Sequence, residues 1–186
     1  SAPIQLSDEN LIAVEMHSDV PIIGYWSSSS DLLNKIWKAT NSSYLANLFG
    51  YPTDCPQREK NGWTGDAHIA IETGLYNFDG ISIYEKWMND FCDEQKDNGV
   101  LPCIIPTSVW GYDWANGVDW TSAVAIIPWE IYRFYGDTTL LRRMYGPIKK
   151  YVSYIESIST NHLTDWGLGD WVPVRSKSNI TLTSSI

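Results

Sequence analysis

The sequence predicts an all-α fold of stacked helical hairpins, preceded by a short β segment. Three observations indicate this fold. Apolar residues recur at helical spacing through most of the chain, the helical stretches come in pairs, and loop tryptophans repeat with a period of about fifty residues. At 186 residues the chain can bury a sizeable core. A period of about fifty leaves room for three hairpins and a fraction, so we expect the chain to form part of a closed ring.

Residues 1–28 do not follow helical spacing, and we expect one or two strands there. Leu11–His17 mixes a short apolar run with rough alternation, and Pro21 breaks the pattern after it. Two strands alone do not form a stable sheet. This segment is therefore expected to end a preceding β domain or to lie against the helices.

Residues 29–186 are expected to form one helical domain that continues past the last residue. Ser27–Asp31 is typical of a helix start, because Ser and Asp side chains accept hydrogen bonds from free backbone N–H groups. Helical spacing then runs to Leu48, and Gly50 and Pro52 end the helix. Further helical stretches are expected at about 67–78, 81–97, 121–135 and 138–157, with another beginning near 180.

Long loops rich in Gly separate these stretches, at residues 50–66, 98–120 and 161–179. Loops of this length in a compact domain are usually functional. Tryptophans 51 or 52 residues apart lie in them: Trp63, Trp114 and Trp166, and also Trp120 and Trp171. The repeat predicts that the aromatic loops gather at one end of the hairpins.

Composition excludes several classes of function. A net charge of −9 disfavours nucleic-acid binding, and no apolar run approaches the roughly 20 residues of a membrane span. The three cysteines lack CxxC spacing and no HExxH occurs, so no metal and no cofactor are expected. Ten Trp and eleven Tyr against four Phe favour a ligand that is partly polar and partly apolar.

The densest polar segment is the loop Asp54–Asp66, with the sequence DCPQREKNGWTGD. Hydrolysis of a glycosidic bond needs one carboxylic acid to protonate the leaving oxygen and a second carboxylate to activate water or attack. Crowded carboxylates beside Trp63 are the conditions that raise the pKa of one of them. Structural roles stay open, with Asp66 as a helix N-cap and Arg58 paired to Asp54.

This motif, continued by Ala67, resembles the signature of the bacterial α-L-rhamnosidases of glycoside hydrolase family 78. The resemblance extends from about residue 10 to the end. It includes Asn47, Pro52-Thr53, Trp120, Ala123, Pro128, Tyr132, Tyr135-Gly136-Asp137 and Gly169-Asp170-Trp171. It implies a partial (α/α)6 barrel, the six-hairpin glycosidase toroid. It also implies hydrolysis of terminal α-L-rhamnose from glycosides or polysaccharides, with inversion at the anomeric carbon.

By position in the family motif, Glu59 is the general acid. The residues implied to bind the substrate are Asp54, Arg58, Trp63, Asp66, Trp120, Asp170 and Trp171. Rhamnose carries a methyl group and a ring of hydroxyls, so Trp faces and Asp/Arg pairs both suit it. Family members differ by one residue between the Arg and the acid, so Glu59 is placed by its distance from Trp63 and Asp66.

An inverting enzyme also needs a general base, about 6.5–9.5 Å from the acid. In the family the base is a Glu from a later part of the barrel, and nothing in this sequence matches its motif. We therefore expect this chain to carry the acid half of the site, to be inactive alone and to lack the C-terminal half of the barrel. An open ring exposes apolar helix faces, so self-association is expected.

Other interpretations remain open. The same fold can serve another sugar, and the same Trp and Asp residues can belong to a non-catalytic carbohydrate-binding module. The loop tryptophans, including Trp110 and Trp114, suit either a substrate platform or loop packing. His68 and Cys55 are expected to be structural. The compartment is open, although large enzymes that degrade polysaccharides are often secreted or periplasmic.

Overall fold

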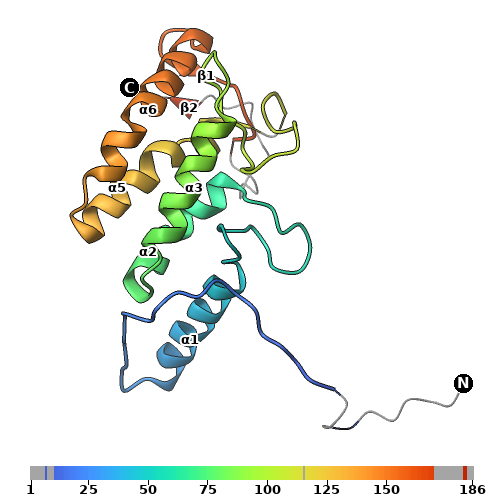
Figure 1. The fold of residues 1–186 in the computed structure, drawn as a ribbon, viewed down its shortest axis with the longest axis vertical. Coiled ribbons are helices and arrows are strands. Elements are labelled where there is room, and N and C mark those ends of the chain that lie inside the picture. The colour runs from blue at the N-terminus through green and yellow to red at the C-terminus, as the bar shows by residue number, and fades with distance from the viewer. Residues whose placement is uncertain (1–6, 8–10, 115, 170–181, 184–186) are drawn as a thin grey trace, which may run out of the picture.

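A computed structural model describes residues 7, 11–114, 116–169 and 182–183. It is mainly helical (Figure 1), which confirms the predicted fold class. The elements are α1 (Asp31–Ala46), α2 (Thr64–Asn77), α3 (Ile81–Glu94), α4 (Val118–Thr121), α5 (Ala123–Tyr135), α6 (Thr139–Ile158), β1 (Leu163–Thr164) and β2 (Leu182–Thr183). No helix in the described ranges is long and apolar enough to cross a membrane.

Helices α2–α3 and α5–α6 form the two consecutive pairs that the repeat predicted, each joined by a three-residue turn. α2 packs against α1, α4 and α5, while α3 packs against α5 and α6. The main core lies between these helices, where the largest fully buried side chains are Trp87, Tyr84 and Phe91 of α3, Ile71 of α2, Ile127 and Ile131 of α5, and Leu140 of α6. The indole Nε1 of Trp87 donates to the carbonyl oxygen of Ile105 at 2.8 Å, which ties the core to the loop after α3.

Helix α1 begins as the sequence predicted. The Ser30 hydroxyl oxygen accepts a hydrogen bond from the backbone N–H of Leu33 at 3.5 Å. The helix ends at Ala46, two residues before Leu48. Unlike the other long helices, α1 has no buried residue, because only one of its sides meets the rest of the described chain.

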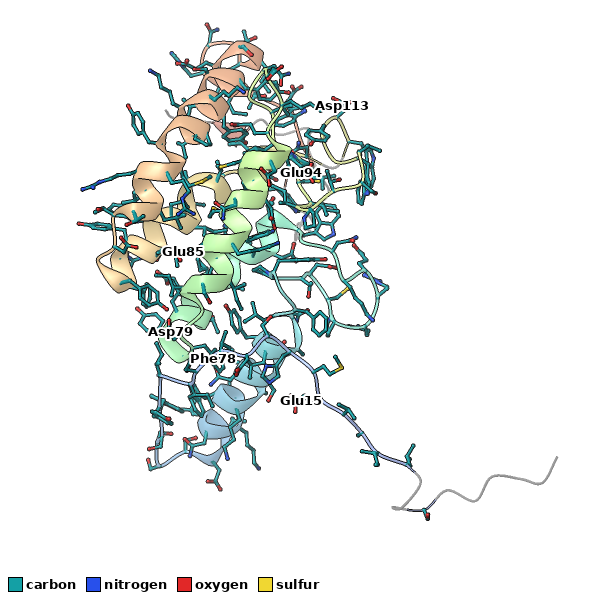
Figure 2. All side chains as sticks on the ribbon, in the orientation of Figure 1. Glu15, Phe78, Asp79, Glu85, Glu94 and Asp113 are labelled. Carbon is teal, nitrogen blue, oxygen red and sulfur yellow. The ribbon has the colours of Figure 1, made fainter. Side chains whose placement is uncertain are left out.

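The strands expected in residues 1–28 are absent from the part of that segment that the structure describes. Residues 11–28 are extended, with one isolated β-bridge between Ile22 and Phe78. Figure 2 labels Phe78. The segment meets helix ends and turns instead of another strand: Ile23 N–H donates to Asn77 and Ser18 N–H to Leu48. Without a neighbouring strand, the alternating residues cannot build a ladder.

The helix expected near residue 180 is also wrong. Leu182–Thr183 form β2, which pairs antiparallel with β1 in the register Leu163↔Thr183 and Thr164↔Leu182. The sequence around β2 alternates apolar residues and threonine, which is the period of a strand, and threonine is β-branched.

The loops that precede α2 and α4 and follow α6 lie together at one end of the helices, as the repeat predicted. Isolated β-bridges join them in series, Trp63 to Ile104 and Gly117 to Gly167. Figure 1 shows the first two loops on the same side of the helical body. Gly62 permits the first junction, because a Cβ there would lie 2.0 Å from the carbonyl oxygen of Ile105.

Candidate functional site

Asp54 closes the loop that carries the motif. Its backbone N–H donates to the Asn61 carbonyl at 3.0 Å, and its Oδ1 accepts from the Asn61 backbone N–H at 2.9 Å. These two bonds form a neck from which residues 55–60 project. Asp54 therefore makes a structural hydrogen bond through Oδ1, and its negative charge also acts on Asp66. Lys60 completes the turn with a φ of 57°, in the left-handed region.

Cys55 connects the carboxylate of Asp54 to the backbone of Glu59. Its thiol donates to Asp54 Oδ2 at 2.9 Å, and the Glu59 backbone N–H donates to Cys55 Sγ at 3.1 Å. The sequence predicted only a small packed residue here. The structure shows that Cys55 also holds the position of Glu59 within the loop.

The Glu59 carboxylate lies between Trp63 and Arg58. Trp63 Nε1 donates to Oε2 at 2.9 Å, and Arg58 Nη2 lies 3.4 Å from Oε1. The Arg58 side chain is 79% exposed and that of Glu59 38%, so this ion pair contributes little to stability. The open alternative of an Arg58–Asp54 pair is not realised, since Arg58 faces Glu59 instead.

Asp66 stands in the first turn of α2, where it is exposed to solvent. Trp63 occupies the N-cap position, so the alternative interpretation of Asp66 as the N-cap is wrong. Although the residue is exposed as a whole, partial desolvation of its carboxyl group raises the pKa of Asp66. Its own backbone N–H and His68 lower the pKa, while the negative charges of Asp54 and Glu59 raise it, and the net shift is upward. The three carboxylates therefore share one electrostatic environment.

Four tryptophan rings form a row along this end of the molecule. Trp63 meets Trp120 edge-on at a centroid distance of 6.3 Å and Trp110 at 6.1 Å, and Trp110 meets Trp114 at 5.7 Å. The row joins the motif loop to the loop that follows α3. Trp63 and Trp120 are partly buried against Cys103 and Ile104.

Gly65 lets the Trp120 ring pack closely, because it has no side chain. A Cβ at Gly65 would come within 3.0 Å of that ring, so the indole packs directly on the backbone of the first turn of α2. The N–H of Trp120 is buried and has no hydrogen-bond partner in the part of the chain that the structure describes. The structure thus brings Trp120 to Trp63 while covering its polar edge.

Other predicted residues have structural contacts or lie outside the described residues. His68 Nε2 contacts the Asp119 carbonyl oxygen at 2.9 Å, which fits a structural role. Trp166 packs on Tyr154 at a centroid distance of 5.5 Å and against the main core, which identifies it as loop packing. Asp170 and Trp171 lie outside the described residues.

The arrangement sets carboxylates beside aromatic rings, which suits a ligand that has both hydroxyls and apolar faces. Glu59 is partly exposed and held by an indole N–H, with Asp54 and Asp66 near it and aromatic rings beside it. In the described ranges, no group of three or more His, Cys, Asp or Glu side chains is placed to hold a metal ion. Sequence reasoning missed the linking role of Cys55 and the contact between Trp63 and Trp110.

Comparison with known proteins identifies the family of this chain. Residues 21–186 match the family model described as the bacterial alpha-L-rhamnosidase 6 hairpin glycosidase domain. An alpha-L-rhamnosidase of Alteromonas sp. (strain LOR) is 32% identical over 164 residues, which cover 87% of this chain and 18% of that protein. An alpha-L-rhamnosidase of Formosa agariphila is 33% identical over 172 residues, which cover 88% of this chain and 18% of that protein.

Solved structures are similar as well. The structure of the alpha-L-rhamnosidase from Dictyoglumus thermophilum aligns with a TM-score of 0.76 at 36% identity, covering 81% of this chain and 17% of that one. The Streptomyces avermitilis alpha-L-rhamnosidase complexed with L-rhamnose aligns with a TM-score of 0.81 at 28% identity, covering 88% and 16%. The chain spans about 18% of the length of the curated relatives it matches first.

Proposed function

This chain belongs to the bacterial α-L-rhamnosidase six-hairpin glycosidase family, and from that premise we propose that it supplies the acid side of a site that hydrolyses terminal α-L-rhamnosides. One observation carries the proposal. Trp63 Nε1 donates to Oε2 of the Glu59 carboxylate at 2.9 Å, and the charges of Glu59 and Asp54 both act on Asp66 in the first turn of α2. The choice of rhamnose as the sugar rests on the relatives, since the curated proteins and solved structures that align are α-L-rhamnosidases.

In the proposed reaction Glu59 is the general acid. Its proton passes to the glycosidic oxygen as the bond from that oxygen to the anomeric carbon breaks. The indole N–H of Trp63 donates to Oε2, which fixes the direction of the carboxyl group beside the glycosidic oxygen in this proposal. A water molecule attacks the opposite face of the sugar and loses its proton to a general base.

The remaining predicted residues bind the rhamnosyl unit in this proposal. Asp54, Arg58 and Asp66 offer charged partners for the hydroxyls. Trp63 and Trp120 offer rings for the apolar edge that ends in the methyl group. Asp170 and Trp171 have the same role by their place in the family motif.

We place the general base outside the described residues. The carboxylates that influence Asp66 most are Asp54 and Glu59, which belong to the same loop. An inverting mechanism instead needs a carboxylate about 6.5–9.5 Å from the acid, with room for water between them. A later segment of a longer protein would supply it.

The exposed face of α1 supports a domain assignment. We propose that residues 29–186 are the N-terminal portion of the (α/α)6 domain and that residues 1–28 lead in from a preceding β domain. Leu32, Leu33 and Ile36 on α1 are 66%, 47% and 52% exposed. Later hairpins of the ring would cover them, whereas this chain alone would expose a face that favours self-association.

The test is hydrolysis of 4-nitrophenyl α-L-rhamnoside by the protein extended past Ile186 to the length of its relatives, beside a panel of other aryl glycosides. We expect turnover of the rhamnoside alone, with the β-anomer of rhamnose released first. The 186-residue chain is the matched control and should be inactive.

Each other outcome points elsewhere. Activity on a different sugar would keep the fold and the acid but overturn the substrate. Sugar binding without any turnover would favour a carbohydrate-binding module. Turnover by the 186-residue chain would contradict the half-site, because a base would then lie within it.

A further inference from the structure

We propose that Trp110 and Trp114 form the platform that binds the leaving group of the substrate through a flat apolar face. The inference rests on the proposed function and extends it from the rhamnosyl unit to the part that departs. An aromatic aglycone and the C–H face of a second sugar both offer such a surface.

The acid lies near the middle of the tryptophan row. A general acid gives its proton to the oxygen that joins the cleaved sugar to the leaving group, so it must lie between the two. Trp63, which holds Glu59, is also central in the row. Trp63 contacts both Trp120 and Trp110, and Trp110 in turn contacts Trp114.

The exposure of the rings separates the two ends of the row. Trp120 is partly buried against Gly65 in the first turn of α2, beside residues proposed to bind rhamnose. Trp114 is 67% exposed and Trp110 38%, and neither belongs to a core cluster of the described residues. The end formed by Trp110 and Trp114 is thus open to solvent, which suits the group that departs.

The loop beneath these two rings is anchored. The Thr107 backbone N–H donates to Glu94 Oε1 at 3.0 Å, and the Tyr112 hydroxyl donates to Glu94 Oε2 at 2.9 Å. Figure 2 shows Glu94 at the end of α3, close to the loop that carries Asp113. The Cys103 backbone N–H donates to the Gly111 carbonyl at 3.0 Å, so this loop is also tied to the buried segment after α3.

Val109 shows that the anchored loop holds a strained backbone. Its φ is 80°, a left-handed conformation that β-branched residues rarely adopt, and its side chain is 92% exposed. Packing of Val109 therefore does not explain the strain. Strain of this kind collects at binding and catalytic sites, where it fixes the neighbouring residues. Here the neighbour is Trp110.

The experiment uses the extended protein and three rhamnosides. Methyl α-L-rhamnoside needs the acid fully but offers nothing to stack, whereas 4-nitrophenyl α-L-rhamnoside offers an aryl ring and a rhamnosyl-glucose disaccharide offers a sugar face. Variants are Trp110→Ala and Trp114→Ala, with Trp129→Ala as the control, because Trp129 is 51% exposed on α5. Wild-type turnover of these rhamnosides tests the proposed function separately.

We expect both loop variants to lower kcat/KM about tenfold on the substrates with a flat leaving group, because each removes a ring on which that group would stack. Methyl rhamnoside and the Trp129→Ala control should be unchanged. A fall on the aryl substrate alone would assign an aromatic aglycone, and a fall on the disaccharide alone a sugar.

Three results would overturn the platform. An equal fall on methyl rhamnoside would mean that the variants disturb Glu59 through Trp63. No fall on any substrate would mean that the rings do not bind the leaving group. If Trp129→Ala also lowered kcat/KM only on the substrates with a flat leaving group, the effect could not be assigned to Trp110 and Trp114.

Discussion

The indole Nε1 of Trp63 donates a 2.9 Å hydrogen bond to Oε2 of Glu59, four residues earlier in the chain. Trp63 is also the N-cap residue of α2, so the helix fixes the donor, whereas Glu59 lies on an exposed loop. The acid therefore takes its orientation from a helix end. Effects on activity are expected in the extended protein, and effects on stability in the 186-residue chain.

Trp63→Phe keeps an aromatic ring but removes the N–H. We expect kcat on a rhamnosyl disaccharide to fall by about three- to tenfold, since one hydrogen bond contributes about 0.5–1.5 kcal/mol. The measurement is steady-state kinetics, with Trp129→Phe as the control. Unchanged kcat in Trp63→Phe would show that the bond does not orient Glu59 during catalysis.

Cys55 tests the same orientation from the backbone side. Cys55→Ala removes both the bond to Asp54 and the acceptor for the Glu59 N–H, whereas Cys55→Ser keeps a donor and an acceptor. We expect kcat to fall more in the Ala variant than in the Ser variant, by up to about tenfold. Equal activity in the two variants would contradict a linking role for the thiol.

Gly65→Ala should destabilise the fold, because the new methyl group would meet the Trp120 ring at 3.0 Å. We expect a loss of about 1–3 kcal/mol in the free energy of unfolding, measured by urea denaturation. Gly146→Ala is the matched control, since nothing lies within 4 Å of a Cβ there and the residue is inside α6. That control should change stability less, because the helix preference of Ala is offset by crowding of its Cβ against the ring of Pro147. A Gly65→Ala variant as stable as the wild type would show that Trp120 does not need this contact.

The raised pKa of Asp66 makes stability depend on pH. A carboxyl whose pKa is higher in the folded chain binds more protons when folded, so it lowers stability as the pH rises past its unfolded value of 3.8. Asp66→Asn should therefore be more stable than the wild type at pH 7, and this advantage should vanish well below pH 3.8. Urea midpoints at the two pH values check it, with Asp165→Asn on an exposed loop as the control. An advantage that persists in acid would contradict the electrostatic cause.

Most of the helical fold follows from local sequence signals. Helical spacing and the Ser30 cap predict α1, and the turn at Gly136 separates α5 from α6 with a φ of 68°. The two wrong elements depended on partners. Residues 11–17 alternate like a strand but meet no strand in the described chain, while Leu182–Thr183 find one in β1.

The site was predictable as a motif but not as a set of contacts. Glu59 and Trp63 are four residues apart in one loop, so sequence position alone brings them near each other. Trp110 comes from the next loop along the chain. The β-bridge between Trp63 and Ile104 and the hydrogen bond from Ile105 N–H to Gly62 bring the two loops together. The repeat of tryptophans indicates that loops gather, but the spacing does not say which rings meet.

The most direct test of the proposed acid is Glu59→Gln in the extended protein, measured on a rhamnosyl disaccharide together with the binding of L-rhamnose. The amide keeps the shape of the side chain and an oxygen for the Trp63 N–H but has no acidic proton. We predict that kcat falls by about 10²–10⁴, the usual contribution of general acid–base catalysis, while L-rhamnose still binds. Turnover equal to that of the wild type would contradict the assignment of Glu59 as the acid.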